Sequence, residues 1–599
     1  MSSVEGYFAL FDSDGGGAIL LSDYRRTIHC DIRSGNHNAL EQAFEAIEAA
    51  LADNEWVALA ADYALGSCFE PSVAVAGDHH TARPMLCGWV FGRQQRLDEA
   101  GVAAFLESHL EGLSEHQRIA GVAEVRASLD AVEYAAKVDR IKYWITEGDC
   151  YQINLTFPLD FRVYGHPLAL YSRLRQRQPV RYGAFVSAPG ELLLSCSPEL
   201  FFERTDNRVV TRPMKGTAPR GATPVDDEAR RSALLASEKE RAENIMIVDL
   251  LRNDLGRLAA PGRVRVESLC EAEAYPTLWQ VVSTISADLP DVRLIDLFRA
   301  LFPCASITGA PKIRAMQCIA ELENRPRGLY TGALGWLAPG GDCRFNVAIR
   351  TLEVEPDGRG KLGVGSGIVI DALSENEYAE CLLKARFLTG FDPGFELIET
   401  MRMERGEYPL LSLHMERLEA SACALGFSCD GPAIRAALAA QLPGRTNGIH
   451  RVRLTLDHAG SCRLAVAPLP DEKNAWQVVL ADEMLDANDY LLRHKTTARS
   501  RYNRALARLV ESPEVFDALF LNTRGEVCEG ARSNVFVERD GVLLTPPLHC
   551  GVLPGVMRRH LLESGRAVEQ VLTLDDLLGA SALYVANALR GLIAVSLRV

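Results

Sequence analysis

A segment containing glycine and proline, TGFDPG at 389–394, interrupts the pattern of strands and helices in this chain of 599 residues. Beyond it, roughly 205 residues restart the alternation and carry a basic segment of their own at 493–508. Glycine and proline end regular elements, so the interruption predicts a boundary. We therefore expect two units, 1–390 and 395–599, although the length also allows three or four average domains.

The first unit combines hairpin-forming strands with separate helices. Its turns APGGD at 338–342 and PDGRG at 356–360 are typical of antiparallel hairpins. This combination predicts an α+β architecture. The expected strands are 151–157, 183–187, 191–196, 200–203, 334–337, 345–354 and 361–365. The expected helices are 131–148, 235–257, 292–302, 310–322 and 375–388.

The charge and apolar content exclude several classes of protein. The chain has 64 Lys and Arg against 79 Asp and Glu, a net charge of −15, whereas general nucleic-acid and anionic-membrane binders need excess positive charge. No stretch reaches the ~18 apolar residues of a membrane span, and the N-terminus predicts no signal peptide. The 15 cysteines include no CxxC pair and predict free thiols. We expect a cytoplasmic protein that binds neither nucleic acid nor membranes.

Two pairs of acidic residues have helical spacing. Glu240 and Glu243 lie three residues apart, as do Glu377 and Glu380, and Lys384 follows one turn later. Two such faces brought together would offer the oxygen ligands that Mg²⁺ prefers. A single pair of this kind is more often solvated surface.

The segment PMKGT places Lys215 between a proline and a glycine. A lysine there could act as a nucleophile if burial or a nearby cation lowered its pKa, but a loop lysine is more often solvated. Glu199 precedes it by sixteen residues and could serve as acid or base. Gly365 and Gly367 could direct backbone N–H groups at a carboxylate, although such a pattern more often marks a tight turn.

Taken together, these residues belong to a series of motifs that resembles the chorismate-utilising enzymes over about 130–388. The motifs are SPEL, PMKGT, ERAENIMIVDLLRNDLGR, FPCASITGAPKIRAM, GLYTGALGW, FNVAIRTLEV, GSGIV and ENEYAECLLKA. The resemblance implies an antiparallel β-sandwich with flanking helices. It also implies Mg²⁺ held by Glu243 and Glu380 with support from Glu240 and Glu377. The implied substrate-binding residues are Arg350, Lys384, Tyr330, Thr308, Gly365 and Gly367.

Two positions distinguish branches of this family. Isochorismate and salicylate synthases use a lysine to activate water where this chain has Gln152, so ammonia is the expected nucleophile. Anthranilate synthases have alanine where this chain has Lys215, and lysine there is similar to aminodeoxychorismate synthase component I. The resemblance implies that Lys215 attacks C2 of chorismate, with Glu199 as proton donor, before ammonia adds at C4. The chain shows no Cys-His glutaminase unit, so ammonia would come from a separate glutamine amidotransferase subunit or from free ammonium.

The second unit has few features that carry chemistry by themselves. Its basic segment 493–508 is most simply a solvated helix face, and the expected helix after Gly555 offers N–H groups to a phosphate as any helix start does. Its motifs, however, resemble the class IV pyridoxal-phosphate enzymes over nearly all of 395–599. They are FELIETMR, LLRHKTTARSRYNRA, EVCEGARSNVFV, TPPLHCGVLPGVMRRHLL and LYVANALRGLIAV. The resemblance implies a fold-type IV α/β domain and, by analogy only, a homodimer.

The same resemblance assigns cofactor roles. Lys495 matches the lysine that binds pyridoxal phosphate covalently, and Glu529 matches the carboxylate that keeps the pyridine nitrogen protonated. Arg417 and the amides of Val556 and Met557 match the phosphate site. The family usually opens with additional strands, whereas this unit begins directly at FELIETMR. Either the fusion dispenses with those strands or the first unit supplies their packing.

The order of the two units predicts consecutive steps. The first would make 4-amino-4-deoxychorismate, and a lyase of the second kind would convert it to 4-aminobenzoate and pyruvate. One alternative is an anthranilate-type synthase fused to an unrelated class IV aminotransferase. Another is a synthase whose second unit is a non-catalytic docking module for the glutaminase subunit.

Overall fold

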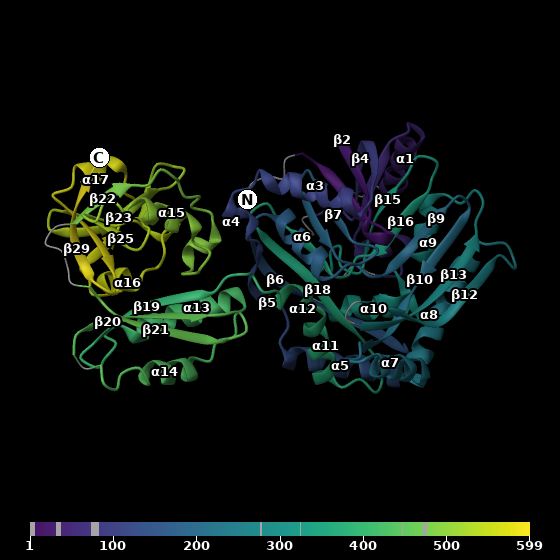
Figure 1. Ribbon diagram of the computed structural model, residues 1–599. Coiled ribbons are helices and arrows are strands. Elements are labelled where there is room, and N and C mark those ends of the chain that lie inside the picture. Colours follow the sequence, from purple (N-terminus) through teal and green to yellow (C-terminus); the bar gives the residue numbers. More distant parts are fainter. Residues whose placement is uncertain are drawn as a thin grey trace.

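The computed structural model describes residues 6–30, 38–73, 83–275, 278–323, 325–445, 447–470 and 476–598. Two units lie beside each other, the first purple to teal and the second green to yellow (Figure 1). Strands and helices alternate irregularly in both, which confirms the predicted α+β class.

Strands β1 to β18 of the first unit form one hydrogen-bonded network in which neighbouring strands run antiparallel. A large antiparallel sheet is thus confirmed, and its arrangement as a two-layer sandwich stays a prediction. The strands are β1 (Phe8–Asp12), β2 (Ala18–Cys30), β3 (Trp56–Ala61), β4 (Leu86–Leu97), β5 (Gly121–Ala127), β6 (Gln152–Tyr164), β7 (Ala184–Ala188), β8 (Glu191–Ser195), β9 (Leu200–Thr205), β10 (Arg208–Arg212), β11 (Met214–Pro219), β12 (Val264–Ala274), β13 (Leu278–Asp288), β14 (Gly309–Ala310), β15 (Ala333–Leu337), β16 (Cys343–Val347), β17 (Thr351–Val354) and β18 (Arg359–Ile368).

Helices of this unit pack on the sheet and join its strands. They are α1 (Ala39–Ala52), α2 (Gly66–Phe69), α3 (Glu99–Glu111), α4 (Glu115–Arg118), α5 (Ala131–Thr146), α6 (Pro167–Arg177), α7 (Pro224–Ala236), α8 (Glu238–Gly256), α9 (Leu294–Leu301), α10 (Lys312–Leu322), α11 (Ser374–Lys384) and α12 (Arg386–Thr389). The expected helix 131–148 corresponds to α5, which begins where the Asp130 carboxylate accepts hydrogen bonds from two backbone N–H groups.

Two expected elements are interrupted. The strand expected at 345–354 is two strands, β16 and β17, because Arg350 between them has a φ of 50° and leaves the extended conformation. The carbonyl of Arg350 then accepts a hydrogen bond from the N–H of Cys196 at 3.0 Å. The helix expected at 375–388 is likewise divided into α11 and α12.

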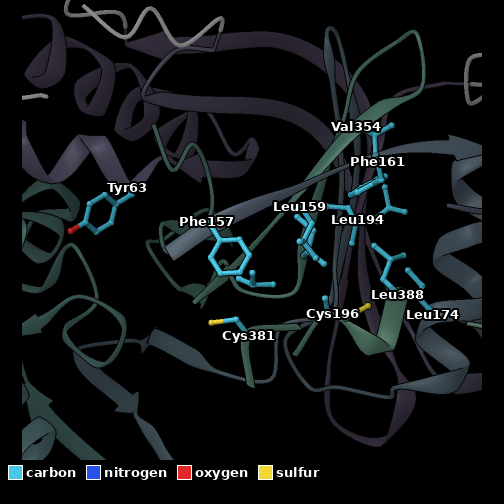
Figure 2. Close-up of a cluster of buried hydrophobic side chains, with 14 of the residues drawn as sticks. Tyr63, Phe157, Leu159, Phe161, Leu174, Leu194, Cys196, Val354, Cys381 and Leu388 are labelled. Atoms are coloured by element: carbon cyan, nitrogen blue, oxygen red, sulfur yellow. The ribbon is translucent and has the colours of Figure 1, made fainter. Parts of the chain in front are cut away.

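One apolar core fixes α11 against the sheet. Figure 2 shows Phe157, Leu159 and Phe161 of β6 within this core, with Cys381 of α11 beside Phe157. Cys381 is fully buried, and its sulfur lies 3.8 Å from the Tyr134 hydroxyl of α5. Glu377 lies one turn before Cys381 on the same side of α11, and Glu380 lies next to it, so this packing holds both acidic residues beside β18 at the site described below.

The second unit contains two sheets. Strands β19 (Leu397–Glu404), β20 (Ile449–Leu456) and β21 (Cys462–Pro468) form an antiparallel sheet. A mixed sheet contains β22 (Trp476–Leu480), β23 (Val515–Leu521), β24 (Val527–Gly530), β25 (Asn534–Arg539), β26 (Val542–Thr545), β27 (Ala567–Glu569), β28 (Ala582–Asn587) and β29 (Gly591–Arg598). The helices are α13 (Leu411–Leu425), α14 (Gly431–Ala439), α15 (Ser500–Arg508), α16 (Val556–Glu563) and α17 (Leu574–Leu578).

The first unit packs directly against the second. Strand β5, α12 and α13 lie at the border between them (Figure 1). Ala123 of β5 and Tyr164 of β6 belong to the same apolar cluster as Phe395 and Met415 of the second unit. The Tyr164 ring also stacks on the Tyr490 ring, with 6.4 Å between the ring centres. The first unit therefore supplies part of the packing around the start of the second.

Polar contacts strengthen this border. The Tyr490 hydroxyl donates to the Glu124 carboxylate at 3.1 Å, and Arg504 forms an ion pair with Glu115 at 2.9 Å.

The fifteen cysteines of the chain are free thiols, as predicted. Among the described residues, no helix has both the length and the apolar character needed to span a membrane.

Candidate active sites

Lys215 lies on β11, partly buried and close to several charged groups from other elements. Burial, assisted by the charge of Lys384, lowers the pKa of Lys215, while the carboxylates of Glu243 and Glu199 oppose this shift. The net direction increases the fraction of free amine at neutral pH, which is the form that can attack carbon.

Glu199 is the carboxylate that lies beside Lys215 at the start of β9. It is 4% exposed, and the Ser306 hydroxyl donates to its Oε1 at 2.6 Å. Burial raises the pKa of Glu199 despite this hydrogen bond and the charge of Lys215. The carboxyl can therefore hold a proton that it later donates. Ser306 was not predicted as a site residue, although it lies in the motif FPCASITGAPKIRAM.

The four acidic residues predicted to bind a metal lie on α8 and α11. Burial, then the charges of Glu243 and Glu380, act to raise the pKa of Glu240, so carboxylates of both helices lie close enough to affect Glu240. Glu380 pairs with Lys384 at 2.8 Å, whereas Glu377 accepts a hydrogen bond from Ser366.

In the part of the chain that the structure describes, no group of three His, Cys, Asp or Glu side chains is arranged to hold a metal ion. Hard oxygen donors that repel one another nevertheless fit a divalent cation. The magnesium site therefore stays a prediction.

Glycines of β18 allow other groups to approach this strand closely. A Cβ on Gly365 would lie 2.8 Å from Thr156 Cγ2, and one on Gly367 would lie 2.6 Å from Gln152 Nε2. Gln152 is 3% exposed, and its Nε2 has no hydrogen-bond partner within the described ranges. A buried donor without a partner is costly, so this amide favours a polar ligand beside Gly367.

The remaining substrate-binding candidates have different environments. Arg350 is partly buried, burial lowers its pKa, and no carboxylate of the described residues pairs with it, which suits a bound anionic ligand. Tyr330 lies over Gly363 and lines a cavity of about 180 Å³. Lys384 donates to the Gly365 carbonyl at 2.9 Å. The Thr308 hydroxyl donates to the Cys304 carbonyl at 2.8 Å, so its contact with substrate stays a prediction.

The second site is built around Lys495. The interpretation of 493–508 as a solvated helix face is correct only for part of the segment. Helix α15 begins at Ser500 and has exposed residues such as Arg504 and Arg508, whereas Lys495 precedes the helix and is partly buried. The Lys495 carbonyl accepts a hydrogen bond from Ile398 of β19 at 2.8 Å. Burial, together with the charges of Arg417 and Arg499, lowers the pKa of Lys495 to about 7.

Arg417 on α13 is held by a carboxylate that the sequence motifs did not assign. Its Nε and Nη2 donate to the two oxygens of Glu399 at 2.8 and 2.6 Å, and the His414 ring also contacts Glu399 at 2.6 Å. Burial acts to raise the pKa of Glu399, but Arg417 and His414 outweigh it and lower that pKa to about 2. A signal was present, since Glu399 follows the apolar residues Leu397 and Ile398 within the strand pattern FELIETM.

The contacts of Arg417 extend to α16. Its Nη1 donates to the Pro554 carbonyl at 3.3 Å, immediately before the helix that begins at Val556 and Met557. A guanidinium beside a helix N-terminus is an arrangement that binds phosphate.

Glu529 is oriented by two hydrogen bonds. The Tyr502 hydroxyl donates to Oε1 at 2.6 Å, and the backbone N–H of Leu553 donates to Oε2 at 2.9 Å. Burial raises the pKa of Glu529 to about 7. Tyr502 was not predicted, although it lies in the quoted motif LLRHKTTARSRYNRA.

Comparison with known families divides the chain into two ranges. Residues 10–390 match the model described as chorismate binding enzyme, and residues 396–597 match amino-transferase class IV.

Individual relatives match the first range. Aminodeoxychorismate synthase component 1 of Bacillus subtilis is 40% identical over 253 residues, covering 42% of this chain and 54% of that protein. Anthranilate synthase component 1 3 of Haloarcula marismortui is 38% identical over 316 residues, covering 52% and 62%. The matches thus span little more than half of these relatives. The solved anthranilate synthase component I of Streptococcus pneumoniae has a TM-score of 0.51 and 24% identity, covers 63% of this chain and 89% of that one, and is similar in fold.

Proposed function

We propose, on the premise that the chain belongs to the chorismate binding enzyme family and carries a class IV aminotransferase unit, that it makes 4-aminobenzoate from chorismate in two steps. The observation that carries the first step is Lys215, placed beside Glu199 with a lowered pKa. The same lysine argues against the anthranilate-type alternative.

In the first reaction, Arg350 would bind a carboxylate of chorismate while the Lys215 amine forms a bond to C2. The C4–oxygen bond breaks, and Glu199 donates the proton with which the hydroxyl leaves as water. Ammonia then forms a bond to C4, and the C2–nitrogen bond breaks to release Lys215. This sequence places nitrogen para to the ring carboxylate.

A magnesium ion would be held by Glu243 and Glu380, with Glu240 and Glu377 in support. It would neutralise substrate carboxylates and orient them. The Bacillus subtilis relative is named as a component 1, which supports a second component for this chain too. We propose that this partner is a glutamine amidotransferase that supplies ammonia.

The second reaction would use the other unit, since its class IV aminotransferase match implies pyridoxal phosphate. The residues fit that cofactor: Arg417 and the first residues of α16 would hold its phosphate, and Glu529 would face its ring nitrogen. When bound, the cofactor supplies an electron sink. Lys495, whose pKa is about 7, would remove the C4 proton as the C3–oxygen bond breaks. The enolpyruvate that leaves takes up a proton to become pyruvate, and the ring becomes aromatic.

The proposal includes a cytoplasmic location and a homodimer formed through the second unit. Free thiols throughout the chain favour a reducing compartment. The homodimer rests on analogy with class IV enzymes.

The product distinguishes the candidate functions. Purified protein would be supplied with chorismate, ammonium, Mg²⁺ and pyridoxal phosphate, and the products separated by chromatography with mass detection. We expect 4-aminobenzoate and an equimolar amount of pyruvate. Accumulation of 4-amino-4-deoxychorismate alone would indicate a silent second unit, and anthranilate would contradict the role given to Lys215.

Replacing Glu399 by glutamine should weaken both the fold and cofactor binding. The substitution leaves the buried Arg417 without its anionic partner, so we expect a loss of about 3 kcal/mol in unfolding free energy. Chemical denaturation and titration with pyridoxal phosphate measure the two effects. Glu404→Gln is the control, because Glu404 lies on the same strand in a more exposed pair with Arg402. Equal stability of the two variants would contradict this prediction.

A further inference from the structure

Arg499 is a partly buried arginine beside the second site, and no ion pair joins it to a carboxylate of the described residues. It precedes α15, is partly buried, and donates to the Ala531 carbonyl at 2.6 Å. Its guanidinium lies 5.5 Å from the centre of the Tyr502 ring. No carboxylate of the described residues forms an ion pair with it, although Glu529 is near enough for its charge to be felt.

Two neighbouring arginines, Arg501 and Arg417, each form an ion pair that stabilises the folded structure. Arg501, two residues further on, is 8% exposed and bonds Asp489 at 2.6 Å. Arg417 shares both oxygens of Glu399. A buried guanidinium that fixes a fold is expected to be paired in this manner, because an unpaired buried charge is costly. Arg499 is partly buried and lacks such a pair, and these two features are typical of an arginine that binds an anionic ligand.

We propose that Arg499 binds a carboxylate of the substrate in the second site. This inference rests on the proposed lyase function, whose substrate carries two carboxylates, one on the ring and one on the enolpyruvyl group. Under the proposed function, three other charged groups of the site have different roles. Arg417 would bind the cofactor phosphate, Glu529 would face the ring nitrogen, and Lys495 would transfer the proton.

The local contacts suit Arg499 to this role. Ala531 and the Tyr502 ring hold the guanidinium while leaving it charged. The positive charges of Arg499 and Arg417 both act on Lys495, so the three basic side chains occupy one region. A dianionic substrate would offset that accumulation of positive charge.

The test uses the full chain loaded with pyridoxal phosphate and the variants Arg499→Gln and Arg499→Lys. Arg508→Gln is the control, since Arg508 is an exposed residue of α15. Calorimetric titrations with 4-aminobenzoate and with pyruvate probe the ring and enolpyruvyl carboxylates separately, and 4-aminobenzamide is the uncharged probe. Lyase kinetics with supplied 4-amino-4-deoxychorismate and the visible absorbance of the loaded protein complete the set.

We expect Arg499→Gln to weaken one of the two carboxylate probes, and to raise KM, by about 10- to 100-fold. Arg499→Lys should lose less, and the amide and the absorbance band should be unaffected. Unchanged binding of both probes would overturn the inference, as would a shifted absorbance band with unchanged KM, which would place Arg499 on the cofactor. Absence of lyase activity in the unsubstituted chain would instead overturn the proposed function, and this inference with it.

Discussion

Replacing Lys495 by alanine should stop 4-aminobenzoate formation and leave the first reaction intact. The purified variant is expected to convert chorismate and ammonium to 4-amino-4-deoxychorismate, while release of pyruvate falls by roughly 10²–10⁴-fold, the contribution of a positioned base. The physical reason is that Lys495 is the amine that interacts with both Glu529 and Arg417, so its loss removes the base from this site. Chromatography of both products over time measures the two reactions in one sample.

The control for this experiment is Arg493→Gln, because Arg493 is an exposed residue two positions before Lys495. It should release pyruvate at the rate of the unsubstituted chain. Full lyase activity in Lys495→Ala would contradict the assignment and favour the second unit as a docking module. Loss of the first reaction as well would indicate that the substitution had disturbed the whole molecule.

Replacing Lys215 by alanine should have the second large effect. We expect formation of 4-amino-4-deoxychorismate to fall by roughly 10³-fold or more, because the covalent step loses its nucleophile. The second reaction, assayed with supplied 4-amino-4-deoxychorismate, should proceed normally. Initial rates with chorismate and ammonium, with mass detection of every aromatic and non-aromatic product, measure the change.

Lys239→Ala is the matched control, since Lys239 is exposed on α8 near the same site. Survival of the first reaction in Lys215→Ala at an unchanged rate would overturn the covalent mechanism. Appearance of anthranilate in that variant would instead show that Lys215 determines the position at which nitrogen is added.

The elements were largely predictable because periodicity and end signals are local. Helix α5 follows an amphipathic pattern and begins at an acidic cap, Asp130, which needs no knowledge of distant residues. Arg350 shows where this approach fails. Its positive φ interrupts a β-branched, apolar run that predicts one strand, and that conformation is linked to a hydrogen bond with Cys196, more than 150 residues away in the sequence.

The same distinction applies to the sites. Family motifs indicated Lys215, Glu199 and Lys495, but the environment that shifts their pKa values comes from other segments of the chain. Ser306 reaches Glu199 across 107 positions, and Glu399 reaches Arg417 from a different element. Whether a basic segment is buried cannot be deduced from its own composition. The composition of 493–508 therefore predicts a solvated helix face, and only the family motif indicates a functional role for Lys495.

The border between the units is a boundary in sequence but not in packing, since Tyr164 and Phe395 share one apolar cluster. Because both units belong to one chain, a single translation product would deliver the two proposed catalysts in a fixed one-to-one ratio. Under the proposed function, the steady level of the intermediate depends on the ratio of two turnover rates and is independent of how strongly two separate genes are expressed. A second step faster than the first keeps that pool small, however much of the protein the cell makes.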